Sequence, residues 1–487
     1  MITRRNVLKA GAAVAGTAGA AGLLIPVASG TAEAADLDPA TVPKFAQAMP
    51  IPPTLAPYSS TGTADYYAMT MKEADVQILP GRLTRVRTFN GSFPGPVIRA
   101  KSGVRAVVQQ TNNLPVATSV HLHGAHVPMD SDGGPMDLIA ANGGTKTYTY
   151  PNDQPHANLW YHDHAHHAES ENVFRGLSGT YLLTDDVEKS NTILPTGAYD
   201  VPIQLRDARF DDQGQLVYAM DDFLNRNVIL ANGKAWPYFN VEHRQYRFRI
   251  FNTSNMRYFN LSLSSGTFTL IGTDGGLLEK PQDMSSVMLS PGERVDILID
   301  FYDYPLNSTV ELRNAADAMP GGPADQITKV LQFRIGSTGA KDFGAIPYQM
   351  RTFPALPPAT VNRSFTLSMD ENGMATDMGY INNVSYDMNR IDTEIAYGTT
   401  EIWTVTNANK IIPHNFHIHL VQFRVLERNG KPITSGPEVG LKDTVNLNPG
   451  ETVKIQATFT GYRGTYLYHC HIFDHAAMGM MAQMRVS

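Results

Sequence analysis

Four pairs of histidines, each with one residue between its members, are the most chemically suggestive feature of the sequence. They are His121 and His123, His162 and His164, His417 and His419, and His469 and His471. Side chains two positions apart in a β-strand point to the same face, so each pair would present two imidazoles together. Brought together, the pairs would supply eight nitrogen ligands. The spacing therefore predicts a multinuclear metal site.

Cys470 stands between the last two histidines and is the only cysteine of the chain. Strand alternation sends its thiol to the opposite face, where it can join His414, His475 and Met480. A thiolate, two imidazoles and a weak thioether form the ligand set of a blue-copper electron-transfer site, whereas zinc prefers four strong ligands. Copper is the better match. Cys470 is also covalently next to two ligands of the other site, which gives electrons a short route.

An internal repeat places these residues. Three stretches share a β-rich run that ends in an Asn-rich turn: 104–113, 246–255 and 401–409. His121 and His123 lie eight and ten residues after the end of the first stretch. His417 and His419 lie at the same offsets after the end of the third. The equivalent positions of the middle stretch are Leu263 and Ser265. The middle copy therefore lacks these ligands.

A second repeated segment leads to the same division. Residues 289–297 match 447–455, with 143–148 as a weaker third copy. Counting 18 and 20 residues from Glu451 gives His469 and His471, while the same count from Glu293 gives Glu311 and Arg313. We therefore expect the metal cluster to lie between the first and third copies.

The rest of the chain consists of short β-rich runs broken by Gly, Pro and Asn, which favours an all-β fold of sandwiches or barrels. The repeats predict three homologous domains, at about 59–186, 187–350 and 351–487. Residues 35–58 are rich in Pro, Ala and polar residues and are expected to form an extended N-terminal strap.

Residues 1–34 are typical of a twin-arginine export signal, with Arg4 and Arg5 before a mildly apolar stretch and an Ala-Glu-Ala cleavage pattern. We therefore expect a secreted, periplasmic or cell-envelope protein. A net charge of −7 makes nucleic acid an improbable partner. A lone cysteine excludes an intrachain disulfide. No other apolar run approaches the roughly 20 residues of a membrane span, so we expect no stable membrane insertion. The oligomeric state stays open.

Four segments resemble the signature segments of the three-domain multicopper oxidases: 121–124, 160–164, 414–419 and 469–480. The likeness covers essentially the whole mature chain and is strongest to bacterial laccases of the spore-coat type and to bilirubin oxidases, through residues 161–165 and 440–445. The resemblance implies three cupredoxin-like Greek-key β-sandwich domains.

The resemblance also implies four coppers per chain. A type 1 copper would be held by His414, Cys470, His475 and Met480. A type 2 copper would be held by His121 and His417. A type 3 pair would take the six remaining histidines: His123, His162, His164, His419, His469 and His471.

The implied activity is that of a laccase-like enzyme, which oxidises a small reducing substrate one electron at a time and reduces dioxygen to water. Phenolic, aminophenolic or bilirubin-like donors are the expected substrates. One alternative is a metallo-oxidase that uses cuprous or manganous ion. Another is a non-enzymatic envelope scaffold, which should have lost ligands, although none is missing here.

Two positions of the chain bear on how protons reach the copper cluster. The family often has an acid directly after the second type 1 histidine, where this chain has Ala476. Asp132, in Asp-Gly-Gly-Pro, matches another acidic position near the cluster. It is expected either to relay protons or simply to form a turn.

Two other features have open interpretations. Asp443 could bind a substrate or cation at the type 1 edge, or it could fix a loop. Seven methionines could be soft ligands for cuprous ion, although core gap-filling is the simpler expectation: Met369, Met374, Met378 and Met388, with Met478, Met481 and Met484.

Overall fold

The computed structural model describes residues 34–487 apart from 316, 318–326, 338–345 and 371–377. The expected export signal lies almost entirely outside the described residues, as does Met374. In the part that is described, strands dominate and helices are few and short. The expected all-β class is confirmed. No helix in this part is long and apolar enough to cross a membrane.

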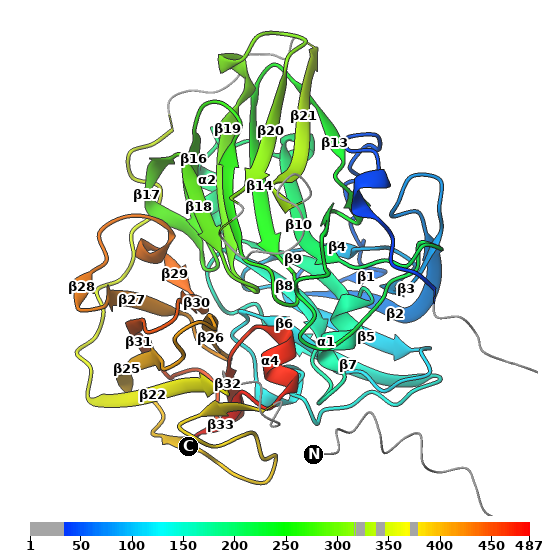
Figure 1. Ribbon diagram of the computed structural model, residues 1–487. Coiled ribbons are helices and arrows are strands. Elements are labelled where there is room, and N and C mark those ends of the chain that lie inside the picture. Colours follow the sequence, from blue (N-terminus) through cyan, green and yellow to red (C-terminus); the bar gives the residue numbers. More distant parts are fainter. Residues whose placement is uncertain (1–33, 316, 318–326, 338–345, 371–377) are drawn as a thin grey trace, which may run out of the picture. The chain divides into compact units, whose positions relative to one another are not determined.

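Six sheets are drawn from three successive stretches of the chain (Figure 1). The first stretch builds two sheets, in the orders β1-β2-β5-β7, with β3 beside β2, and β4-β9-β8-β6. Their strands are β1 (Ser59–Ser60), β2 (Ala64–Val76), β3 (Thr84–Phe89), β4 (Gly95–Lys101), β5 (Arg105–Asn112), β6 (Val120–His123), β7 (Gly144–Tyr150), β8 (Ala157–Asp163) and β9 (Ser178–Thr184).

The middle stretch forms sheets in the orders β12-β11-β10-β14-β19-β16-β17 and β13-β21-β20-β15-β18. Its strands are β10 (Asp200–Ala208), β11 (Val228–Ala231), β12 (Lys234–Ala235), β13 (Tyr238–Glu242), β14 (Gln245–Asn252), β15 (Phe259–Leu263), β16 (Phe268–Thr273), β17 (Gly276–Met284), β18 (Ser286–Leu289), β19 (Arg294–Asp300), β20 (Thr309–Asn314) and β21 (Lys329–Ser337).

The last stretch forms sheets in the orders β23-β22-β25-β31-β27-β28, with β29 beside β27, and β24-β33-β32-β26-β30. Its strands are β22 (Val361–Met369), β23 (Gly379–Ile381), β24 (Thr393–Ile395), β25 (Thr400–Asn407), β26 (His414–Ile418), β27 (Phe423–Arg428), β28 (Lys431–Pro432), β29 (Leu441–Lys442), β30 (Thr444–Leu447), β31 (Thr452–Thr458), β32 (Gly464–His469) and β33 (Met481–Val486).

The sequence repeat corresponds to a repeated strand pattern. The three Asn-ended runs form β5, β14 and β25, and each pairs parallel to an earlier strand and antiparallel to a later one. The later strands, β7, β19 and β31, carry the second repeated segment. Alternating apolar side chains give each stretch its own buried core. The exact domain boundaries stay a prediction.

The segment after the signal runs along two of these stretches. Its backbone donates hydrogen bonds from Phe45 to Trp236 and from Met49 to Tyr238, and then from Leu55 to Val97 in the first stretch. These main-chain bonds join the segment to both stretches, and the strap over residues 35–58 stays a prediction. The described residues also form three short α-helices: α1 (Glu169–Phe174), α2 (Asp186–Ser190) and α4 (Phe473–Ala477).

Candidate metal centre

The eight paired histidines lie on four strands that end at one place. β6 and β8 are antiparallel neighbours with His121 opposite His162, and β26 and β32 are antiparallel neighbours with His417 opposite His469. The second histidine of three of the pairs stands just past a strand end, at 164, 419 and 471. All eight side chains are buried. Strand alternation therefore turns both members of each pair into one interior space.

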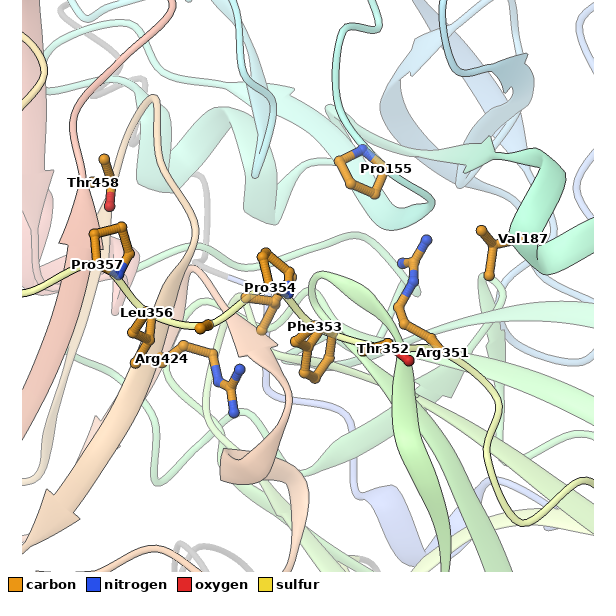
Figure 2. A pocket seen from close by; sticks show the side chains of 12 residues that line it. Pro155, Val187, Arg351, Thr352, Phe353, Pro354, Leu356, Pro357, Arg424 and Thr458 are labelled. Atoms are coloured by element: carbon orange, nitrogen blue, oxygen red, sulfur yellow. The ribbon is translucent and has the colours of Figure 1, made fainter.

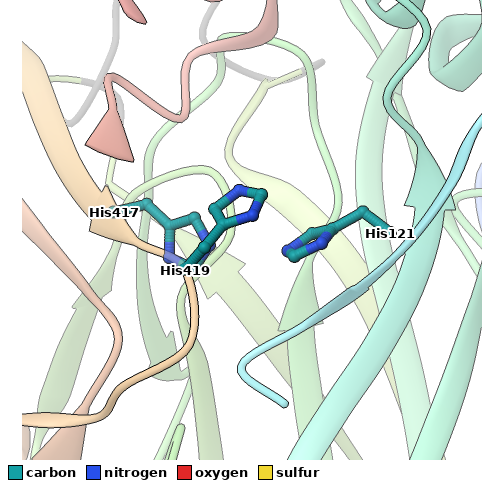
Figure 3. Close-up of side chains that lie close together, drawn as sticks. All are labelled: His121, His417 and His419. Carbon is teal, nitrogen blue, oxygen red and sulfur yellow. The ribbon is translucent and has the colours of Figure 1, made fainter. Parts of the chain in front are cut away.

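Histidines of the first stretch stack on histidines of the last. The ring centroids of His121 and His419 are 3.8 Å apart, as are those of His123 and His417. Nδ1 of His123 lies 2.9 Å from Nε2 of His471. Figure 3 shows His121 approaching His417 and His419 from the opposite side. The predicted convergence of the four pairs is what the structure shows.

Hydrogen bonds behind the rings fix which nitrogen faces the interior. The Nδ1–H groups of His121, His162 and His417 donate to the main-chain carbonyls of Asp132, Asp163 and Asp443, at 2.6, 2.9 and 2.8 Å. His469 donates in the same way to the carbonyl of Cys470. An imidazole that donates from Nδ1 keeps its lone pair on Nε2, the form that binds metal. The surrounding backbone therefore orients the ligands.

The acid–base state of the rings also suits metal binding. Burial, reinforced by neighbouring imidazoles, lowers the pKa of His121 to about 3 and that of His417 well below its ordinary value. Burial alone lowers the pKa of His419 to about 3. Neutral rings at physiological pH offer lone pairs rather than protons.

Several buried ring nitrogens have no hydrogen-bond partner among the described residues. They are Nε2 of His121, His162 and His417, Nδ1 of His471, and both nitrogens of His164. Donor atoms of three trios lie within 4.8 Å of one another: His121 with His417 and His419, His121 with His123 and His162, and His164 with His419 and His469. Unpartnered buried donors are costly unless a ligand uses them. The cluster therefore fits bound copper ions.

The second predicted site lies on the other side of Cys470. Its Sγ is 3.6 Å from Nδ1 of His475 and 3.9 Å from Nδ1 of His414, and all three residues are buried. Met480 is fully buried, and its main chain bonds to those of Cys470 and His475. Burial raises the pKa of the Cys470 thiol to about 12, so a cation is needed to hold the thiolate. His414, Cys470 and His475 are thus gathered around one point, and the main chain holds Met480 beside them. The division of all twelve ligands among copper types stays a prediction.

Asp132 contacts the cluster directly. Its carbonyl accepts from His121, and its Oδ2 accepts from Nδ1 of His419 at 2.8 Å. Its Oδ1 accepts no hydrogen bond from a described residue, although Nδ1 of His121 lies 3.6 Å away. The residue lines a hollow of about 330 Å³ together with Tyr386 and Tyr466. Burial raises the pKa of Asp132 to about 6, although His121 opposes this effect. Asp132 does end a short 3-10 turn. The carboxylate nevertheless does more than form the turn.

Asp443 is not at the edge of the Cys470 site, so the expectation of a substrate contact there is wrong. Its Oδ1 lies 2.8 Å from Nε2 of His123, and both its oxygens accept from Arg294. It is completely buried. Asp443 lies between β29 and β30, and the packing of the domains places it next to the histidine cluster. The local sequence does not reveal that packing.

The sequence reasoning missed a buried charged group behind the cluster. Arg294 opens β19, and its backbone N–H donates to Asp274. Lys442 reaches Asp274 and Glu293, each at 3.0 Å. All four residues are buried. The available signal was Arg294 itself, an arginine at a repeat position where the last copy has Thr452.

Other candidates lie apart from the cluster. A cavity of about 440 Å³ is lined by Phe353, Pro354, Leu356, Arg351 and Arg424, among others, and includes none of the predicted ligands (Figure 2).

Of the methionines, Met369 packs on the last core, whereas Met378 and Met388 are exposed. Core filling is therefore wrong for those two.

Sequence profiles described as multicopper oxidase match residues 70–188, 160–316 and 356–487. The chain is 36% identical to the laccase of Bacillus subtilis, covering 92% of this chain and 99% of that one. It is 35% identical to the bilirubin oxidase of Albifimbria verrucaria, covering 90% and 81%. Among solved structures, a laccase from Pediococcus acidilactici superposes with a TM-score of 0.84 at 33% identity, covering 92% and 95%.

Proposed function

The chain belongs to the multicopper oxidase family, and on that premise we propose that it oxidises phenolic, aminophenolic or bilirubin-like donors. Its domains are cupredoxin-like, its cofactor is copper, and it is a laccase-like oxidoreductase with dioxygen as the electron acceptor. Copper supplies one-electron transfer and oxygen binding when present. The class of electron donor is what we propose, and the laccase and bilirubin oxidase relatives support it.

One structural observation supports this function above the others. Cys470 faces His414 and His475 on one side, while its sequence neighbours His469 and His471 face the histidine cluster on the other. An electron that enters at the thiolate thus reaches the cluster through a few covalent bonds. The geometry suits an enzyme that collects electrons one at a time and uses them together.

The chain itself contributes orientation and exclusion of water. Main-chain carbonyls hold the rings in the ligand tautomer, and all eight cluster histidines are buried. Water is thereby kept from the place where oxygen is reduced, which prevents loss of partly reduced products. Asp132 contacts His419 and lines the 330 Å³ hollow, where its Oδ1, which accepts no hydrogen bond from a described residue, can take up a proton from water.

A donor panel tests the proposal. The copper-loaded protein is given a dimethoxyphenol, an aminophenol, bilirubin, cuprous ion and manganous ion, and oxygen uptake is recorded. We expect the highest kcat/KM among the organic donors. Fast turnover of cuprous or manganous ion with negligible phenol oxidation would instead establish a metallo-oxidase. Less than one bound copper per chain would favour the scaffold alternative.

We also propose export by the twin-arginine route, on the basis of Arg4, Arg5 and the segment that follows. The test fuses residues 1–36 to a reporter that folds in the cytoplasm. The parent signal should deliver the folded reporter outside the inner membrane, and a double substitution of Arg4→Lys and Arg5→Lys should retain it inside. Equal delivery of both would overturn the assignment.

A further inference from the structure

Reduction of dioxygen to two waters consumes four protons with four electrons, yet the histidine cluster is buried. Most carboxylates near it are already engaged. Asp163 accepts from the main-chain N–H groups of Ser119 and Ala165 and from Asn172. Asp443 is held by Arg294. These partners stabilise the charged form and oppose the burial that raises the pKa of both carboxylates, so they restrain the two groups from gaining and losing protons freely.

Glu169 is different. It is the first residue of α1, only 1% exposed, and neither of its carboxyl oxygens has a hydrogen-bond partner among the described residues. An ionised carboxylate buried without partners is strongly disfavoured, so such a group is expected to carry a proton. We therefore expect the Glu169 carboxyl group to be protonated, and no described residue accepts a hydrogen bond from it.

Its position links it to the cluster. The N–H of Glu169 donates to the carbonyl of Ala165, the residue that follows the ligand His164. The next residue, Ser170, bonds through Oγ to Asp474, which directly precedes the ligand His475. α1 also packs against α4. Glu169 thus belongs to the seam between α1 and α4, the two helices that follow segments with predicted ligands. In α4, position 476 is an alanine, so no acid directly follows His475.

Groups on every side of this seam bear on its charge. Burial raises the pKa of Glu169 to about 8, helped by the carboxylates of Asp163 and Asp474, although the main-chain N–H of Glu169 itself opposes this effect. Asp474 is paired with Arg226. The loop before α1 carries His166 and His167, and the segment before β24 carries Tyr386. The rings of His166 and Tyr386 lie 5.0 Å apart, so Tyr386 is beside the loop that leads into α1.

A route to solvent lies next to Tyr386. This tyrosine lines the 330 Å³ hollow that also reaches Asp132. Water in that hollow can return a proton to a carboxylate on the Tyr386 side. The hollow is thus lined by Asp132 and by Tyr386, which contacts the loop before α1 through His166.

We infer that Glu169 is an internal proton donor for oxygen reduction: its carboxyl O–H releases a proton toward the histidine cluster, and the carboxylate is reprotonated by water from the hollow beside Tyr386. The donor supplies the four electrons, solvent supplies the four protons overall, and Glu169 returns to its starting state. The inference rests on the oxygen reduction stated above and is independent of which donor is used.

The test compares Glu169→Gln, which keeps the shape but cannot titrate, with Glu171→Gln on the same helix. Each copper-loaded protein is reduced anaerobically and mixed with oxygen in a stopped-flow instrument. We expect Glu169→Gln to reoxidise at least about tenfold more slowly and to lose the pH dependence near pH 8, with unchanged anaerobic reduction of the blue band. Glu171→Gln should behave like the parent.

A second readout needs no turnover. Infrared difference spectra of the copper-free protein, taken as pH rises, should show a protonated carboxyl band disappearing near pH 8 in the parent and absent in Glu169→Gln. Unchanged reoxidation, an equal effect of Glu171→Gln, or an unaltered infrared band overturns the inference. Should Glu169→Gln fail to load copper, Glu169→Asp decides: an unshifted pH profile overturns the proposal. A parent protein that is not reoxidised by oxygen would instead contradict the oxidase function itself.

Discussion

Arg294 and Asp443 form a buried two-pronged ion pair, with Nη1 and Nη2 of the arginine each 2.6 Å from one carboxylate oxygen. The arginine comes from the middle stretch and the aspartate from the last, and Nε of Arg294 donates to the carbonyl of Asn158 in the first. Asp443 in turn touches His123. The ligand-free middle stretch therefore supports the metal centre.

Replacement of Arg294 by lysine should weaken this support, because an ammonium cannot form both parallel bonds. Removal of a partner from a buried ion pair costs about 3–5 kcal/mol, and the lysine variant should lose a substantial part of that stability. We expect a lower melting temperature and a lower copper content in Arg294→Lys, measured by calorimetry and metal analysis. Arg313→Lys, which is on the exposed side of β20, is the control. Full copper occupancy at the parent's stability would contradict the supporting role.

Cys470→Ser should abolish blue absorbance and turnover with phenols while the fold is kept. The hydroxyl is nearly the same size as the thiol but is a far poorer ligand for copper in this set. Visible absorbance, circular dichroism and oxygen uptake give the three readouts. A variant that still oxidises phenols at the parent rate would show that electrons enter elsewhere.

Asp132→Asn should slow oxygen reduction more than reduction of the Cys470 site. The amide keeps the size of the carboxylate but cannot carry its proton or accept from His419 in the same way. Loss of a group that orients a metal-bound histidine typically costs about 10–100-fold. Stopped-flow measurement of the two half-reactions separates the effects, and equal slowing of both would remove the relay role.

Copper removal should destabilise the chain. The rings are uncharged, and several of their nitrogens have no hydrogen-bond partner among the described residues, so chelation leaves buried lone pairs without a ligand. Ligand binding to the folded state alone adds about 3–4 kcal/mol at 100–1,000 times the dissociation constant. We expect the melting temperature to fall on chelation and to recover when copper is added back. Recovery with zinc alone would argue against selectivity for copper.

Acid should destabilise the protein through a buried ion-pair network next to α2. Burial opposes ionisation of Asp200, but Arg249 and Arg247 outweigh it and lower the pKa to about 2. Because the folded pKa lies below the ordinary value, this contribution is full above about pH 5 and is lost as the pH falls toward 2. The loss should be of the order of 2 kcal/mol. Denaturant titrations across that range should show a smaller pH slope for Asp200→Asn.

The metal centre was predictable because its signals are local. Alternation within a strand fixes where His469, Cys470 and His471 point, and the repeat says which copies carry ligands. The Arg294–Asp443 pair was not predictable, because it joins residues 149 positions apart through the packing of domains. Asp443 was misplaced for the same reason. Glu169 was overlooked since an acid at the start of a short helix usually faces water.

The eight cluster ligands have a consequence for charge balance. Each is an uncharged ring, so every positive charge that copper brings to the interior must be compensated by anions further out. Asp132 and Asp443 are the carboxylates that touch those rings. The protein would thus separate two tasks that simpler metal sites combine: imidazoles would hold the ions, while Asp132 and Asp443, the latter paired with Arg294, would supply the negative charge around them.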